Sequence, residues 1–328
     1  MSKTLALSLS TSTSHGQTFP DADTQQQMLE EERVFLGNMK LGLQREQMLA
    51  VRAAIGGDDA ALQQIRQSRN QAPSLPEGVV ATYPVPDICV FSPAAATTRK
   101  RPIMLYLHGG GWCFGSINSC ARFCAALALE GDCCVAALNY RLSPAFPFPA
   151  PLDDCTWAFA YLKQHAAEWG CDPSRVSVGG DSAGGNLALA TALSARGVCK
   201  VVSIYPVVKL FTELTASWQQ YATGYGDDAE LLEAFNEAYA GDYARDPLVS
   251  PGLAIDSALQ ALPPVLIVSA GHDILFDQTR DFAERLQRLG HPLEYHVYPT
   301  ATHLFITVPG QPTAFRHAVK TVARFLND

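Results

Sequence analysis

One serine in this sequence stands in a setting that suits nucleophilic chemistry. Ser182 is the central residue of GDSAG, Gly180 to Gly184, which matches the pattern G-x-S-x-G between an apolar run and an alanine-rich helical pattern. In that setting the serine occupies a tight strand-to-helix turn, and its neighbours two positions away must be small. The helix that follows favours negative charge near its N-terminus. The alternative is a glycine-rich turn with an N-capping serine, whereas a phosphate-binding loop would need Lys-Ser/Thr after the glycines.

A serine nucleophile needs a histidine base and an acid that orients the histidine. Where the serine lies in a G-x-S-x-G turn between a strand and a helix, the acid and then the histidine are expected to follow it along the chain. Asp273 follows the apolar run VLIVSAGH, and His303 lies in the loop after the last apolar run. Asp277 is the alternative acid, although it more simply caps the next helix. We expect the other histidines near these runs to be structural: His272, His296 and His317.

The glycines of LHGGGWCFG, residues 107–115, allow two interpretations. A dinucleotide-binding turn needs an acidic residue after the following strand and a helix that starts at the glycines. Asn139 stands where that acid is needed, and residues 112–119 have the composition of an irregular loop. An HGGG-type loop instead offers free backbone N–H groups to a developing oxyanion, and the N–H of Ala183 supplies another. The sequence therefore predicts an oxyanion hole.

Composition limits the function classes. The chain has 328 residues, 48% of them hydrophobic, and a net charge of −8. The run Thr97–Arg101 is too short for a nucleic-acid-binding patch, and no apolar run approaches the roughly 18 residues of a membrane span. The nine cysteines lie mostly in apolar runs without a C-x-x-C pair. We therefore expect reduced thiols in the cytoplasm, and neither a metal site nor a cofactor.

The elements that must position these residues alternate between apolar runs and helical patterns. This alternation predicts an α/β fold with a mostly parallel sheet, covered by helices on both faces, whose ligands bind at the carboxyl ends of the strands. The predicted strands are 88–91, 103–107, 133–138, 176–178, 201–205, 265–269 and 293–298. The predicted helices of this part are 121–130, 152–169, 184–195, 277–289 and 313–326.

Two regions fall outside the alternation. We predict a disordered tail over residues 1–20 and helices over residues 21–75, which end in a proline-rich linker. Residues 76–328 form the main domain, with an insertion at about 206–245 that is too long for a plain crossover. We expect this insertion and the N-terminal helices to form a cap.

Taken together, the motifs resemble the hormone-sensitive-lipase-like branch of the α/β-hydrolases, close to the bacterial acetyl esterases. They lie in order between about residues 105 and 325: HGGGW, NYRLSP…FPAPLDD, GDSAGGN, DPLVSP, LPPVLIVSAGHDIL and HLF. The resemblance implies an α/β-hydrolase fold with an eight-stranded sheet and a helical cap. It also implies a triad of Ser182, Asp273 and His303.

The same resemblance implies that Gly110, Gly111 and Ala183 form the oxyanion hole. We further expect Trp112 and Asp181 to contact the substrate, with packing as the alternative for Trp112. The chain departs from the family pattern at Leu304, where members usually have glycine. It also departs at His272, Ile274 and Leu275, which flank Asp273.

The resemblance predicts a serine carboxylesterase that hydrolyses short-chain acyl esters through an acyl-enzyme. Alternatives are an arylformamidase or other amidase of the same fold, a non-catalytic small-molecule receptor, or a regulatory protein. The expected partner is a small ester, without nucleic acid or membrane. The last predicted strand, residues 293–298, could pair at an open edge to form a homodimer.

Overall fold

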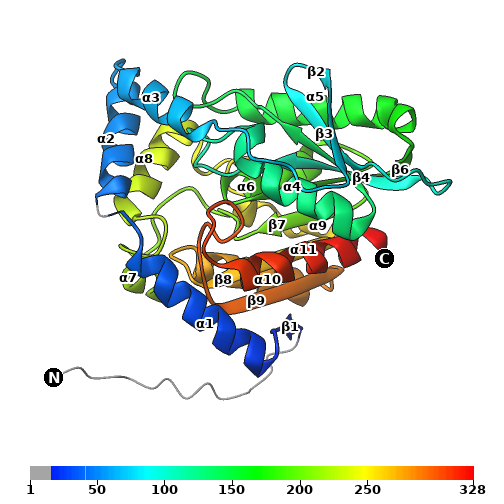
Figure 1. The fold of residues 1–328 in the computed structure, drawn as a ribbon. Coiled ribbons are helices and arrows are strands. Elements are labelled where there is room, and N and C mark those ends of the chain that lie inside the picture. Colours follow the sequence, from blue (N-terminus) through cyan, green and yellow to red (C-terminus); the bar gives the residue numbers. More distant parts are fainter. Residues whose placement is uncertain (1–15, 41) are drawn as a thin grey trace.

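A nine-stranded sheet runs through the centre of the computed structural model, which describes residues 16–40 and 42–328 (Figure 1). The strand order is β1-β9-β8-β7-β6-β4-β5-β3-β2, and neighbours are parallel except for the antiparallel pairs β2–β3 and β3–β5. The strands are β1 (Gln17–Thr18), β2 (Val79–Val85), β3 (Ile88–Pro93), β4 (Arg101–Leu107), β5 (Cys134–Leu138), β6 (Cys171–Asp181), β7 (Val201–Ile204), β8 (Val265–His272) and β9 (Leu293–Thr302).

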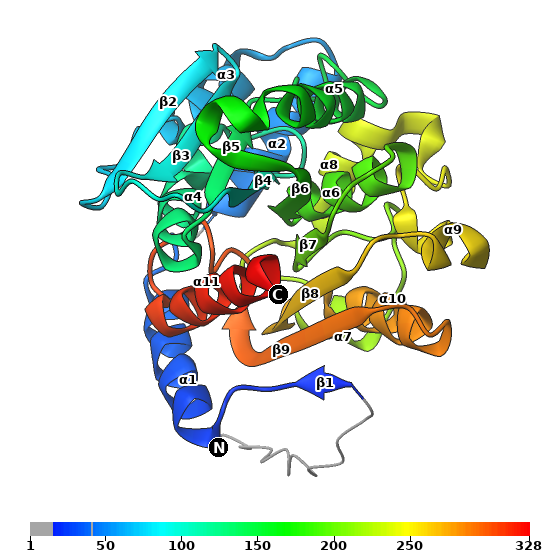
Figure 2. The same cartoon turned by 90° about the vertical axis from the view of Figure 1, so that its right-hand side faces the viewer.

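Helices cover both faces of this sheet. On one face α4 and α11 lie side by side, and on the other lie α5, α6 and α10 (Figure 2). The helices are α1 (Ala22–Gly37), α2 (Leu43–Ile55), α3 (Ala60–Arg69), α4 (Ile117–Gly131), α5 (Ala150–His165), α6 (Ala183–Ser194), α7 (Ala216–Gln220), α8 (Ala229–Ala240), α9 (Asp256–Gln260), α10 (Phe276–Arg288) and α11 (Pro312–Asn327).

Strand β4 explains why the apolar runs are continuous. Every residue of β4 is buried. Because successive side chains point to opposite faces, Ile103 and Leu105 join the core under α5 and α6, while Met104 and Tyr106 join the core under α4 and α11. A strand covered on both faces therefore needs apolar residues at consecutive positions.

The predicted α/β-hydrolase fold with a mostly parallel sheet is confirmed, but the sheet has nine strands rather than eight. All seven predicted runs are strands. The additional strands lie at the edges of the sheet: β2 carries Pro84 and is half-exposed, and β1 has only two residues. Of the predicted disordered tail, residues 1–15 lie outside the described residues, while Gln17 and Thr18 form β1.

The last strand is not the fully open edge that we expected. Gln17 and Thr18 pair in parallel with Tyr295 and His296, so β1 covers part of the outer side of β9. This pairing removes part of the surface on which the homodimer prediction depended. Dimerisation stays a prediction, which light scattering of the purified protein tests.

Two segments far apart in sequence meet above the carboxyl ends of the strands. Helix α2 from the N-terminal region packs against α8 from the insertion, and both lie at the same end of the molecule (Figure 1). Helix α3 is tied to the loops after β4 and β5, because Arg66 donates hydrogen bonds to the carbonyls of Cys113 (2.8 Å) and Ser143 (2.7 Å), respectively. None of the helices described here is both long and apolar enough to cross a bilayer.

Candidate active site

Ser182 lies at the turn between β6 and α6, in a backbone conformation that few residues with a side chain adopt. Its φ is 55° and its ψ is −119°, and its N–H donates to the carbonyl of Ile204 at 2.9 Å. A Cβ atom at Gly180 or Gly184 would clash with the backbone around Leu107, which explains the small residues on both sides. Strain of this kind persists only where the surrounding structure holds it, and it is concentrated at functional sites.

Asp273 and His303 form a buried hydrogen-bonded pair. The Nδ1 atom of His303 lies 2.7 Å from Oδ2 of Asp273, and both residues are about 1% exposed. The second oxygen of Asp273 accepts a hydrogen bond from the N–H of Leu275 at 2.9 Å, which fixes the carboxylate. Because Nδ1 donates to the carboxylate, Nε2 is the atom left for proton transfer.

The Nε2 atom of His303 has no hydrogen-bond partner among the described residues. The nearest charged group is Asp227, from the insertion, whose Oδ2 lies 3.5 Å away without hydrogen-bond alignment. Ser182 is linked to this ring through β7: Tyr205, which follows the carbonyl bonded by Ser182, contacts the His303 ring at 4.4 Å between centroids. The structure thus gathers Ser182, Asp273 and His303 at the carboxyl ends of β6, β8 and β9.

Carboxylates around His303 decide its charge. Burial lowers the pKa of His303, but the charge and hydrogen bond of Asp273, together with Asp227 and Asp181, outweigh burial and raise that pKa to about 9. Burial also raises the pKa of Asp227, although the neighbouring His303 acts in the opposite direction. The acidic group beside Nε2 therefore affects the protonation of the histidine.

The glycine loop after β4 is held from below by Asp181 and His108. Oδ1 of Asp181 accepts hydrogen bonds from the N–H of Gly109 (3.1 Å) and the hydroxyl of Tyr106 (2.8 Å). Burial lowers the pKa of His108 to about 4, so its ring is neutral at pH 7 and its Nδ1 donates to the carbonyl of Gly109 at 2.9 Å. These contacts fix the loop before any substrate binds.

The predicted oxyanion-hole amides are available for a ligand. The N–H groups of Gly110, Gly111 and Ala183 donate to no backbone or side-chain acceptor within residues 16–40 and 42–328. Gly110 and Gly111 have φ values of +108° and +59°. A Cβ at Gly111 would also overlap the ring of Phe235 on α8, so only glycine fits beneath this part of the insertion.

Asp181 and Trp112, for which we expected substrate contact, have packing partners within the protein. Asp181 is 1% exposed and bonded to Tyr106 and Gly109, so it supports the loop from beneath. Trp112 is equally buried and its ring stacks on Tyr239 at 4.5 Å, which is the packing alternative. Substrate contact by either residue stays a prediction.

Asp181 provides a test of this supporting role through stability. Burial raises its pKa from 3.8 to about 6, although the Tyr106 hydroxyl acts against the rise. The folded protein therefore holds this proton more tightly than the unfolded chain, and stability falls as pH rises from about 4 to about 6. Asp181→Asn lacks this titration, so we expect its free energy of unfolding to gain about 3 kcal/mol relative to wild type over that range.

Urea unfolding at pH 4, 5, 6 and 7 measures this difference, with the exposed Asp242→Asn as the matched control. A constant difference between Asp181→Asn and wild type across the series would contradict the buried titration.

The competing candidates have structural partners of their own. Asp277 accepts a hydrogen bond from the N–H of Ser217 (2.8 Å) and pairs with Arg280 (2.7 Å). His272 contacts the buried Glu32 of α1, and so fastens that helix beside Asp273. Of the remaining two candidates, His296 contacts Glu294, and the ring of His317 contacts the ring of Tyr298.

A cavity of about 270 Å³ lies beside this constellation, between the N-terminal helices and the insertion. Gly110 lines it from the glycine loop, Asp227 from the insertion, and Leu304 from the loop after β9. Leu304 adopts φ 70°, a left-handed conformation that disfavours residues with a branched side chain and suits the glycine expected at this position. Its side chain occupies space in the cavity that a glycine would leave open.

Sequence reasoning missed Asp227 and Arg69, which also lines the cavity. Asp227 stands in GDDAELL, where an acidic pair before a helix predicts only a cap. Arg69 ends a polar helix without any motif. Within the described residues, no cluster of three or more His, Cys, Asp or Glu side chains has the arrangement of a metal site.

The fold is that of the α/β-hydrolases, which are built on a mostly parallel sheet. A family model described as "alpha/beta hydrolase fold" matches residues 104–307. The chain belongs to this family, and within it to the hormone-sensitive-lipase-like ester hydrolases.

Similar proteins of known activity support this placement. The chain is 32% identical to "Carboxylesterase NlhH" of Mycobacterium tuberculosis over 69% of its own length and 74% of that enzyme, and 32% identical to "Arylesterase" of Saccharolobus solfataricus over 81% and 90%. The match to "Carboxylic ester hydrolase LipN" of M. tuberculosis (33% identity) covers 63% of this chain and only 58% of that protein.

A solved structure, the ester-hydrolase EH1AB1 from the metagenome of Lake Arreo, superposes with a TM-score of 0.74 at 29% identity, over 91% of this chain and 98% of that one.

Proposed function

We propose that the protein is a serine carboxylesterase that hydrolyses small, short-chain acyl esters. The observation that carries the proposal is the arrangement around His303: Nδ1 is hydrogen-bonded to Asp273, Nε2 has no hydrogen-bond partner among the described residues, and Ser182 occupies a strained turn at the same carboxyl edge of the sheet. In this proposal Ser182 attacks the ester carbonyl, and His303 accepts its proton. Asp273 holds the ring in the required tautomer and stabilises the imidazolium.

The oxyanion of the tetrahedral intermediate would accept hydrogen bonds from the N–H groups of Gly110, Gly111 and Ala183. Collapse of the intermediate passes the proton from His303 to the leaving alcohol and leaves an acyl-serine. Water, deprotonated by the same histidine, then releases the acid. This cycle requires neither a metal nor a cofactor.

The size of the cavity supports a small substrate. A volume of about 270 Å³ lies below the roughly 300–1,000 Å³ typical of ligand pockets, and Leu304 narrows it. We propose that residues 21–75 and 206–245 together form the cap that encloses it, because both segments supply lining residues. Nine free thiols, eight of them buried, support a reducing cytoplasm.

A series of p-nitrophenyl esters from C2 to C16 tests the proposal. We expect the highest kcat/KM at C2 to C6, and a maximum at C12 or beyond would refute the short-chain preference. Comparable hydrolysis of formyl-kynurenine would favour an arylformamidase. An inactive wild-type protein that nevertheless binds small molecules would favour a receptor.

The charge of Asp227 gives a prediction about pH. The base is active when His303 is neutral, so the kcat/KM of wild type should rise with pH up to about 9, following the raised pKa of His303. Asp227→Asn removes one carboxylate that raises this pKa. We therefore expect the acidic limb of its profile to shift to lower pH.

Initial rates on p-nitrophenyl acetate from pH 5.5 to 10 measure the shift. Asp228→Asn, a neighbouring change at a carboxylate that accepts from the N–H of Gly224, is the control. If the profiles of Asp227→Asn and wild type coincide, the carboxylate does not influence the base.

A further inference from the structure

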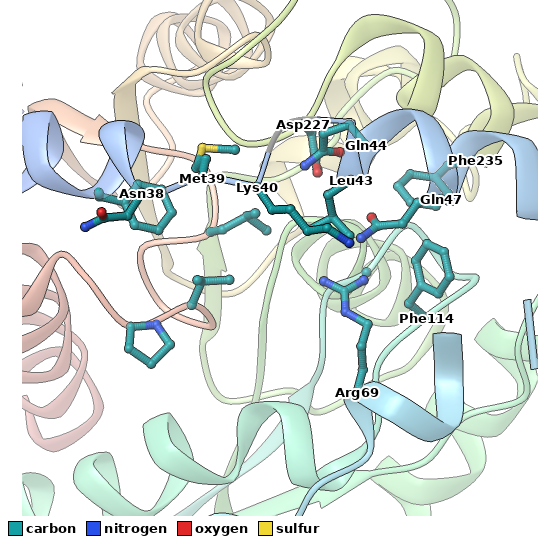
Figure 3. Close-up of a pocket in the computed structure, with 15 residues that line it drawn as sticks. Asn38, Met39, Lys40, Leu43, Gln44, Gln47, Arg69, Phe114, Asp227 and Phe235 are labelled. Atoms are coloured by element: carbon teal, nitrogen blue, oxygen red, sulfur yellow. The ribbon is translucent and has the colours of Figure 1, made fainter. Parts of the chain in front are cut away.

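Three hydrogen-bond donors from the N-terminal helices converge on one part of the cavity. The side chains of Lys40, Gln47 and Arg69 all line it, and their polar ends point toward one another (Figure 3). Lys40 follows α1, Gln47 lies on α2 and Arg69 ends α3. The cap thus brings two cationic groups and an amide to the same place.

The guanidinium of Arg69 makes no hydrogen bond and no ion pair with the part of the chain that the structure describes. It lies 5.2 Å from the centre of the Phe114 ring, which belongs to the loop that carries Gly110. Arg69 is exposed to solvent, although the protein around it lowers its pKa by burial, against the opposing charge of Asp227. A guanidinium that lies over an aromatic ring at the cavity, with no hydrogen bond to the described residues, has its N–H donors available to an anion.

Arg66, one helical turn earlier, shows the contrast. Its guanidinium bonds to two backbone carbonyls and serves the fold. Arg69 lies on the same helix and carries the same guanidinium group, but it lines the cavity and makes no hydrogen bond with the described residues. The difference separates a structural arginine from one that is available to a ligand.

Asp227 is the acidic residue among those that line the cavity, and its charge acts on Arg69 from a distance. Asp227 lies beside His303, and no atom pair joins it to Arg69 within the 4.0 Å of an ion pair. Among the described residues Lys40 forms an ion pair with Glu46 at 3.7 Å, and both side chains are more than 60% exposed, so this pair is weak. Cationic donors therefore dominate the end of the cavity near Arg69.

We propose that Arg69, with Lys40 and Gln47, forms a subsite for a carboxylate on the substrate. This inference rests on the proposed esterase function and narrows it to esters that carry a second, ionised carboxyl group: half-esters of dicarboxylic acids or acylated hydroxy acids. Gly110 lines the same cavity, so one small molecule can place its ester carbonyl at the oxyanion hole and its carboxylate on the guanidinium, which suits bidentate binding.

Matched esters with and without the charge test the proposal. Monoethyl adipate is compared with ethyl hexanoate, which places the carboxylate on the acyl side, and 4-acetoxybutanoate with butyl acetate, which places it on the alcohol side. For each pair, pH-stat assays give the ratio of kcat/KM for the charged ester to that for the neutral one. We expect a ratio above one for at least one pair.

Arg69→Met should lower this ratio at least about tenfold, as expected on losing a charge-assisted hydrogen bond. Arg69→Lys should restore part of it. Arg45→Met, on α2 and lining a different hollow, should leave it unchanged. A wild-type preference for the neutral ester in both pairs, or an equal loss on charged and neutral esters in Arg69→Met, overturns the subsite.

Binding without turnover separates this inference from the proposed function. Calorimetry with monoethyl adipate is done on Ser182→Ala and on Ser182→Ala/Arg69→Met, with circular dichroism to verify folding. Binding that is weakened at least about tenfold by the second change supports the subsite, and equal binding overturns it. Absence of Ser182-dependent hydrolysis in wild type would instead refute the esterase proposal alone.

Discussion

Ser182→Ala is expected to lower kcat on p-nitrophenyl acetate by at least about 10,000-fold, the scale seen when the nucleophile of a Ser-His-Asp triad is removed. The expectation follows from the turn between β6 and α6, which holds Ser182 at φ 55° next to the free N–H of Ala183. Residual activity should come only from the oxyanion hole and from substrate binding.

A fluorophosphonate probe followed by peptide mapping provides the second measurement. Wild type should carry the label on Ser182, and the alanine variant should remain unlabelled. Ser177→Ala is the matched control, because Ser177 is a buried serine of strand β6, which precedes Ser182. This variant should retain both activity and label. A label on another serine, or full activity in Ser182→Ala, would remove Ser182 from the mechanism.

Asp273→Asn should have an effect of comparable size, a loss of about 10,000-fold in kcat. The carboxylate accepts a hydrogen bond from Nδ1 of His303 at 2.7 Å and so keeps Nε2 free of a proton in the neutral ring. An asparagine amide can donate instead, which favours the opposite tautomer with the proton on Nε2. The ring would then be unable to accept the proton of Ser182.

Asp277→Asn is the decisive control, because Asp277 is the other acid that the sequence offers. In the structure it bonds to Ser217 and Arg280. We expect Asp277→Asn to keep its rate within about a factor of ten while losing stability. The reverse result, with an active Asp273→Asn and an inactive Asp277→Asn, would exchange the roles of the two residues.

The strands and the turn that hold the site could be predicted because short stretches of sequence determine them. Continuous apolar runs revealed the strands buried on both faces, such as β4, and the glycines around Ser182 revealed a turn that excludes side chains. Chain order then selected Asp273 and His303. The edge strands were missed because β2 is half-exposed and a two-residue strand such as β1 leaves no pattern.

The cavity could not be predicted because its residues meet only through tertiary packing. Asp227 reaches His303 from a loop of the insertion, and Arg69 reaches Phe114 from the end of a polar helix. Neither position has a periodicity or a motif that marks it. The place of Asp181 beside Ser182 is visible in the sequence, but its contact with Gly109 beneath the loop is not.

The hydrogen bond from Arg66 to the carbonyl of Cys113 joins the N-terminal helices to the loop that carries Gly110 and Gly111. A second bond, to Ser143, reaches the loop after β5, which itself donates to the carbonyl of Trp112. These helices lie outside the segment matched by the family model, which begins at residue 104. Detachment of α3 would release the loop while the nine-stranded sheet stays intact. Activity would then be lost on heating at a lower temperature than the one at which the core melts. The temperature of inactivation and the melting temperature of the core would therefore measure two different events.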